Sequence, residues 1–324
     1  MHPLRRWLLI VAPLPILSAS WSLTHWTGAQ LNASPEPNHV VAVPVAPRVA
    51  GLVTSADHAN AADGALRLLC DTQAEHWRRQ LGPECAVIVR PPFVLAGDLT
   101  HERLDDWHQQ TIAPAMRALT YRYFSTQPDE PISILLWSTE SSYNQYARRL
   151  FGDEDVSVYG YYRPQLRTLV MNISTGGGTL VHELTHALAA FDFPGMPEWF
   201  NEGLASLHEA CRIREDGTGL DGLVNWRLDG LQSVAQAGQL PSLRDLVRRR
   251  DFRGPQIGLN YAQARYLCLF LQQQGKLDDF YQTAKEQRHA DPTGHDALIG
   301  LFEHRDWSRL DREFSSWVAN LRRD

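Results

Sequence analysis

The fold and the chemistry of this chain are both indicated by one stretch, Thr179-Leu180-Val181-His182-Glu183-Leu184-Thr185-His186-Ala187-Leu188. Its flanking residues carry no charge, which predicts a buried helix rather than a solvated one. Residues four positions apart lie on one helix face, so His182 and His186 can turn an imidazole nitrogen toward the same metal ion. Glu183 lies about 100° further round the helix, where its carboxylate reaches a water on the ion rather than the ion itself. Burying these three side chains is costly without a partner, which favours a metal site.

A second segment predicts a third ligand, and it reads Pro197-Glu198-Trp199-Phe200-Asn201-Glu202-Gly203-Leu204-Ala205-Ser206-Leu207. Residues 193–197 contain two prolines and a glycine, which favour a helix end, a turn and a new helix start. At 1.5 Å per residue, the first helix rises roughly 6 Å beyond His186, and the second returns roughly 7–8 Å by Glu202. Antiparallel helices would therefore bring Glu202 level with His186. The alternative for Glu202 is a surface carboxylate on an ordinary helix.

Two histidines and one glutamate predict a single Zn²⁺ ion with one coordination position open for water. An open position distinguishes a catalytic zinc site from a closed structural one. Zinc held in this way lowers the pKa of its water to about 7, and Glu183 can then act as the general base. The predicted reaction is hydrolysis of an amide such as a peptide bond.

The two segments together resemble the gluzincin metallopeptidases, in which an H-E-x-x-H helix is followed by an N-E-x-x-A-like segment that supplies the third ligand. The short spacing, and the later Asn260-Tyr261-Ala262-Gln263, are closer to the peptidase MA-like branch than to thermolysin. The resemblance is specific over residues 179–207 and looser over 86–320. It implies a zincin-like fold, zinc bound by His182, His186 and Glu202, and Glu183 as the base.

Gluzincins often add a tyrosine or histidine that stabilises the oxyanion of the reaction. The resemblance favours Tyr261, because such a tyrosine follows the third ligand by a helix-rich stretch; the alternative is a core aromatic. The rivals for this role are His208, Tyr159, Tyr161 and Tyr162. Ser206 and Glu209 follow Glu202 on the same predicted helix, and they are candidates for contacts that support the ligands or for plain packing roles.

The hydrophobic pattern predicts an α+β fold, with a small mixed sheet in residues 63–190 and an all-helical half in residues 191–324. The first half ends in the helix of His182 and His186, and the second carries Glu202. In the first half we expect strands at 86–95, 131–137, 156–162 and 166–173, and helices at 66–81, 101–124 and 139–151. In the second half we expect helices at 226–237, 240–249, 261–274, 277–288, 295–303 and 307–322.

Gluzincins bind the substrate backbone along an edge strand that precedes the metal helix. The resemblance assigns this role to Leu166–Ile173, whose alternative is an ordinary core strand. We expect this strand to form a hairpin with residues 156–162, with the turn near Arg163-Pro164-Gln165.

The first residues predict export. Met1 to Arg6 is short and basic, Trp7 to Leu17 is apolar, and Ser18-Ala19-Ser20 offers small residues for cleavage. Residues 1–20 are therefore interpreted as a signal peptide or signal anchor, and residues 21–62 as a linker or extended arm. We expect a periplasmic or extracellular protein that contacts a membrane only if an N-terminal anchor is retained.

The composition narrows the partners and the chemistry of the cysteines. A net charge of −6 does not indicate a nucleic-acid partner. The four cysteines suit an oxidising compartment: Cys70 can pair with Cys85 and Cys211 with Cys268, other pairings are open, and buried free thiols are the alternative.

These patterns favour an exported zinc metallopeptidase that acts on a peptide or protein substrate. One alternative is a zincin-fold protein that no longer cleaves and serves as a binding or scaffolding module. The presence of Glu183 and of all three ligands weighs against that alternative. The other alternative is a zinc amidase that acts on a cell-wall peptide.

Overall fold

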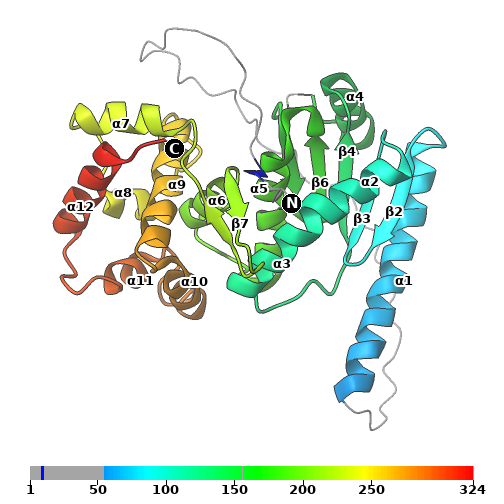
Figure 1. Ribbon diagram of the computed structural model, residues 1–324, viewed down its shortest axis with the longest axis horizontal. Helices are drawn as coiled ribbons and strands as arrows, with labels where there is room; N and C mark the ends of the chain where they lie inside the picture. The colour runs from blue at the N-terminus through cyan, green and yellow to red at the C-terminus, as the bar shows by residue number, and fades with distance from the viewer. Residues whose placement is uncertain (1–8, 11–54, 155, 324) are drawn as a thin grey trace, which may run out of the picture.

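The computed structural model describes residues 9–10, 55–154 and 156–323, with side chains described from Asp63 onward. Apart from Leu9–Ile10, the predicted signal segment at 1–20 lies outside the described residues, as does most of the predicted arm at 21–62. Figure 1 shows two halves side by side, one built on a sheet and the other mainly on helices. Within the described ranges, none of the helices combines the length and the apolar character that crossing a membrane needs.

The sheet of the first half has five strands in the order β2-β3-β4-β6-β5. The strands are β2 Ala86–Arg90, β3 Phe93–Gly97, β4 Ile132–Trp137, β5 Gly160–Arg163 and β6 Thr168–Asn172. The inner pairs β3–β4 and β4–β6 are parallel, whereas the outer pairs β2–β3 and β5–β6 are antiparallel. The α+β class and the mixed sheet predicted from the sequence are therefore confirmed.

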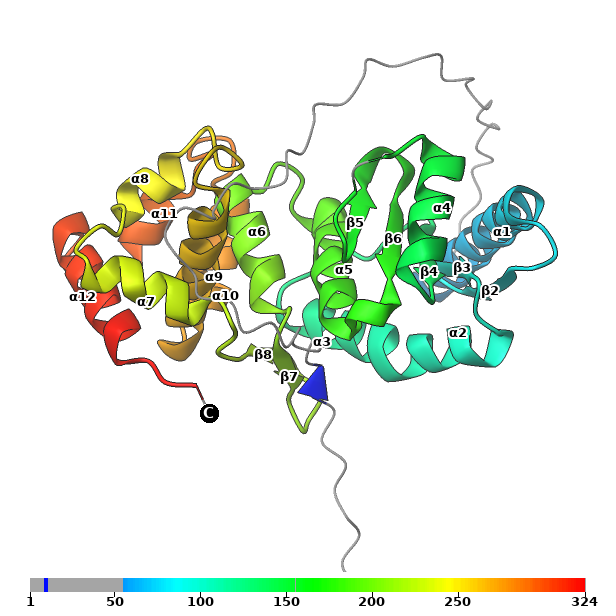
Figure 2. The same cartoon turned by 90° about the horizontal axis from the view of Figure 1, so that it is seen from above.

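Helices cover both faces of this sheet. The covering helices are α1 Ser55–Leu81, α2 His101–Trp107, α3 Ala113–Arg122, α4 Glu140–Phe151 and α5 Gly177–Asp192. Leu135 and Trp137 of β4 pack toward α1 and α4, whereas Ile134 and Leu136 pack toward α2, α3 and α5. Figure 2 shows α5, the helix of both histidines, lying beside β5 and β6. Helix α1 begins at Ser55, so the end of the predicted arm is helical.

Two of the elements predicted in this half differ from those in the structure. Pro91 and Pro92 divide the predicted strand at 86–95 into the hairpin β2–β3, because proline lacks the N–H that a continuing strand would donate. The helix predicted at 101–124 passes Pro114 without ending. A turn of π-helix at His108–Ile112 joins α2 to α3 just before that proline.

The predicted hairpin near residue 164 is confirmed, but the predicted edge strand is wrong. Leu166–Ile173 corresponds to β6, which lies between β4 and β5, so β5 forms the edge of the sheet. The residues explain this order. Leu169, Val170 and Met171 are all buried, as an interior strand covered on both faces requires, whereas β5 contributes the half-exposed Tyr162.

The six helices predicted after residue 226 are confirmed, with small shifts at their ends. The helices of this half are α6 Glu198–Leu207, α7 Leu228–Gln236, α8 Leu243–Arg248, α9 Ile257–Gln273, α10 Leu277–Glu286, α11 His295–Gly300 and α12 Trp307–Asn320. The half is not all-helical, however. β7 (Cys211–Ile213) and β8 (Leu220–Gly222) form an antiparallel hairpin, and β1 (Leu9–Ile10) pairs with β7.

The cysteines do not form the pairs considered from the sequence. Cys70, Cys85, Cys211 and Cys268 are all free thiols. Cys211 lies on β7, where its backbone pairs with Ile10 and Gly222. The alternative of unpaired thiols is therefore the one that the structure favours.

The two halves are joined at the C-terminal end of α5. The buried Asp192 accepts hydrogen bonds from Ser125 Oγ (3.0 Å), Thr126 N (2.7 Å), Tyr281 Oη (2.7 Å) and Lys285 Nζ (2.8 Å). Burial alone would raise the pKa of Asp192, but the bonds from Lys285 and Tyr281 lower it below its ordinary value. This carboxylate therefore ties α5 to α10.

Helices α6 and α9 approach closely because Gly203 has no side chain. A Cβ atom at Gly203 would lie 2.8 Å from the carbonyl oxygen of Ala264 and 3.0 Å from Cys268 Sγ. We expect Gly203→Ala to lower the free energy of unfolding by about 1–3 kcal/mol, because helix backbone cannot move aside locally. Denaturant unfolding measures this change. Gly64→Ala in α1 is the control, since a Cβ there meets nothing within 4 Å; equal stability of the two variants would contradict the packing argument.

Candidate metal centre

A short connection between α5 and α6 sets the position of Glu202. Gly195 has a φ of 81°, a left-handed conformation that glycine adopts without strain. Met196 N donates to Phe193 O at 3.1 Å, which closes the turn. Pro197, with a φ of −53°, then precedes the first residue of α6 with a backbone that suits a helix start. The helix stop, turn and restart predicted for residues 193–197 are therefore found.

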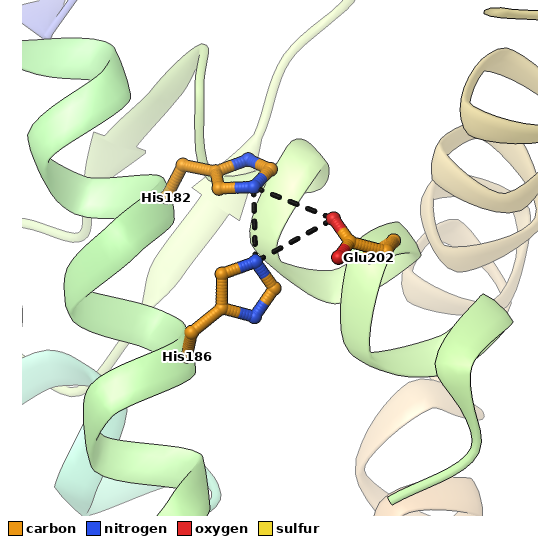
Figure 3. A group of neighbouring side chains, drawn as sticks. All are labelled: His182, His186 and Glu202. Carbon is orange, nitrogen blue, oxygen red and sulfur yellow. Dashed lines mark hydrogen bonds and ion pairs between the residues drawn. The ribbon is translucent and has the colours of Figure 1, made fainter. Parts of the chain in front are cut away.

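The three predicted ligands come together between α5 and α6. His182 Nε2 and His186 Nε2 each lie 3.5 Å from Glu202 Oε2. The two nitrogens lie 3.0 Å from each other. Figure 3 shows both rings on α5 facing the carboxylate that α6 presents. The three ligand atoms lie within 4.8 Å of one another, as a shared metal ion requires.

The charges of this group fit a cation. Glu202 Oε2 is buried and has no hydrogen-bond partner among the residues that the structure describes, which is costly for a carboxylate oxygen. Burial alone would lower the pKa of His182, but its contacts with Glu202 and Glu209 raise it to about 10. Burial raises the pKa of Glu202, yet His186 and His182 bring it well below its ordinary value. The group therefore attracts positive charge, which a divalent cation can supply in place of protons.

His186 is held through its other ring nitrogen by a hydrogen bond, whereas the corresponding nitrogen of His182 lies beside a carboxylate without a hydrogen bond among the described residues. His186 Nδ1 lies 2.9 Å from Asn201 Oδ1, and because an amide oxygen only accepts, Nδ1 donates and Nε2 keeps its lone pair for a metal. His182 Nδ1 lies 3.2 Å from Glu209 Oε1, which Arg227 Nη2 also contacts at 3.1 Å. A hydrogen bond such as that of His186 fixes the ring of a metal-binding histidine and raises its basicity.

Asn201, Glu209 and Arg227 contact the two histidines directly or through one another, and the sequence predicts only some of them. Glu209 is among the predicted supporting residues, although it lies just past the end of α6 rather than on it. Burial raises its pKa, but Arg227 and His182 bring it down to about 2. Asn201 and Arg227 were not predicted. The position of Asn201 directly before Glu202 is a usable signal, whereas no local pattern marks Arg227.

Glu183 lies beside the ligands on α5, and its side chain is buried. Burial raises the pKa of its carboxyl above the ordinary value, while the neighbouring His182 and His186 oppose that rise. A carboxylate whose pKa is shifted toward neutrality is suited to accept a proton.

Tyr261, at the start of α9, lies in the same environment. Its ring packs on Phe252 with 5.4 Å between centroids, and the Arg227 guanidinium lies 5.7 Å from its centroid. Burial raises the pKa of Tyr261, and the negative charge of Glu202 raises it further. The phenol therefore keeps its proton and remains a hydrogen-bond donor near Glu202.

The rival residues lie in other surroundings. His208 is fully buried, lies 3.3 Å from Thr185 Oγ1, and has its pKa lowered to about 3 by burial. Tyr161 donates to Asp153 at 2.5 Å, Tyr159 is exposed, and Tyr162 is half-buried against the core. The backbone oxygen of Ser206 accepts from Arg265 Nε at 2.9 Å, and its buried hydroxyl has no hydrogen-bond partner within the described ranges. Tyr261 remains the candidate.

The comparisons with known proteins do not add to this geometry. No model of a protein family matches the chain, and a search of curated proteins finds no similar sequence. What can be inferred about the site therefore depends on its residues and their arrangement.

Proposed function

We propose that this protein is an exported, zinc-dependent metallopeptidase of the gluzincin type. The observation that supports the proposal is the convergence of His182, His186 and the buried Oε2 of Glu202, with Glu183 beside them. Two imidazoles and one carboxylate are the ligand set of catalytic zinc sites that keep a position open for water. Zinc bound there would polarise a carbonyl and lower the pKa of a water to about 7.

The side chains of the chain itself would move the protons. Glu183 would accept the proton of the attacking water and pass it to the leaving amine, which is the work of a general base that becomes a general acid. The protonated phenol of Tyr261 would donate a hydrogen bond to the oxyanion as it develops. Asn201 and Glu209 would hold the two imidazole rings in the orientation that metal binding needs during these steps.

The edge of the sheet offers a place for an extended substrate. Asn172 N donates to Tyr159 O at 3.0 Å, so the backbone groups of alternate residues 159, 161 and 163 face β6. The N–H and C=O groups of Gly160 and Tyr162 then face away from the sheet. An extended peptide can pair with these groups as an added strand, beside the helix of the two histidines. This assignment replaces Leu166–Ile173.

The proposal is tested by digestion of a peptide library with the zinc-loaded protein, and the products are read by mass spectrometry. We expect cleavage by the zinc-loaded protein and none by a chelated sample. Zinc-loaded protein that cleaves no peptide would favour the scaffold alternative. Cleavage confined to cell-wall peptide fragments would favour the amidase alternative.

A further inference from the structure

The two carboxylate oxygens of Glu202 have different surroundings. Oε2 lies between the two histidines and accepts no hydrogen bond from the described part of the chain. Oε1 accepts a hydrogen bond of 2.5 Å from Nη2 of Arg253. A bond between a guanidinium and a carboxylate is charge-assisted and roughly twice as strong as a neutral one. One oxygen of the ligand is therefore engaged by the protein while the other is available to a metal.

Arg253 reaches Glu202 from a loop that other contacts hold in place. The loop connects α8 to α9, and Asn260 Nδ2 donates to the carbonyl of Phe252 at 2.6 Å. The ring of Phe252 in turn packs on Tyr261. Arg253 Nε also donates to Glu198 Oε1 at 2.9 Å, so its guanidinium bridges two carboxylates that lie one turn apart on α6.

We propose that Arg253 is a positioning residue that confines Glu202 to metal binding through Oε2 alone; this inference rests on the proposed metal site. A carboxylate can bind a metal ion through one oxygen or through both. With Oε1 engaged, Glu202 supplies a single ligand atom and leaves coordination space for water and substrate. Without Arg253, the carboxylate of a side chain that is only 2% exposed loses this donor and is free to present both oxygens.

The contact between Arg253 and Glu202 can be tested by substitution, because Arg253 is partly exposed. The side chain of Arg253 is 48% exposed, so its loss leaves no cavity in the core. Arg250 lies on the same loop, is exposed, and makes no hydrogen bond or ion pair among the described residues, which makes it a matched control. Arg253→Lys is a second variant, since lysine keeps the charge but lacks the planar fork that spans Glu198 and Glu202.

The experiment compares wild type, Arg253→Ala, Arg253→Lys and Arg250→Ala by competition for zinc with a chromophoric chelator and by the visible spectrum of the Co²⁺-loaded proteins. We expect Arg253→Ala to lose about 10–100-fold in zinc affinity, as is typical when a partner of a metal ligand is removed. We also expect weaker Co²⁺ absorption, because the spectrum reports the number and geometry of the ligands. Arg253→Lys should lie between, and Arg250→Ala should match wild type.

Thermal unfolding of the metal-free proteins shows that each variant is folded. Zinc affinity and a Co²⁺ spectrum of Arg253→Ala equal to those of wild type would overturn the role of Arg253 while leaving the metal site intact. A wild-type protein that binds neither ion would overturn the metal site itself, and the role of Arg253 with it.

Discussion

Glu183→Gln is expected to lower peptide hydrolysis by about 10²–10⁴-fold, the usual contribution of a general base, while zinc stays bound. Glutamine has nearly the same shape as glutamate, so the buried position next to His182 stays filled. It carries no carboxylate and therefore cannot accept the proton of the attacking water. Initial rates on a peptide identified in the library digestion, together with zinc content per chain, measure both halves of this expectation.

The matched control for this variant is Glu140→Gln, because Glu140 is exposed at the start of α4 on the other face of the sheet. It should retain the rate and the zinc content of wild type. If Glu183→Gln kept the wild-type rate at full zinc occupancy, Glu183 would not be the base. If it lost zinc as well as activity, the experiment would have removed a ligand rather than a base.

Loss of a ligand is expected to remove both the metal and the stability that it gives. Wild type should carry about one zinc per chain, as a single three-ligand site holds. A ligand that binds only the folded state stabilises it by about 4 kcal/mol at roughly a thousand times its dissociation constant. Zinc should therefore raise the thermal unfolding midpoint of wild type but not that of Glu202→Ala or His186→Ala.

The control for the ligand variants is His289→Ala, since His289 is exposed in the turn that follows α10. It should show the same zinc-dependent rise as wild type. Zinc measured directly at full occupancy in Glu202→Ala would show that this carboxylate is not a ligand. A zinc-dependent rise in His186→Ala equal to that of wild type would do the same for the imidazole.

The grouping of His182, His186 and Glu202 could be predicted because its geometry is local. His182 and His186 are related by one helical turn, and Glu202 follows after a connection whose prolines and glycine fix its path. Counting the rise along two antiparallel helices is then enough to bring the three side chains together. The α+β class follows in the same way from the periodicity of apolar residues.

The contacts that support the ligands could not be predicted, because they join distant parts of the chain. Arg253 is 51 residues from Glu202, and its direction depends on the packing of Phe252 and on the bond from Asn260. The edge strand was misassigned for a related reason. A hairpin pattern shows that two strands pair, but which of them also pairs with β4 depends on the rest of the sheet.

The carboxylate of Asp192 bears on how the site would take up a metal ion. It ties the last residue of α5 to Tyr281 and Lys285 of α10, through bonds that involve none of the three ligands. Folding alone can therefore fix the position of α5, and with it the two histidines, before any ion binds. A disordered site loses conformational entropy when its ion binds. In this protein most of that entropy would already be lost when the chain folds. Metal uptake should then resemble the filling of a rigid cavity more than the folding of a zinc finger.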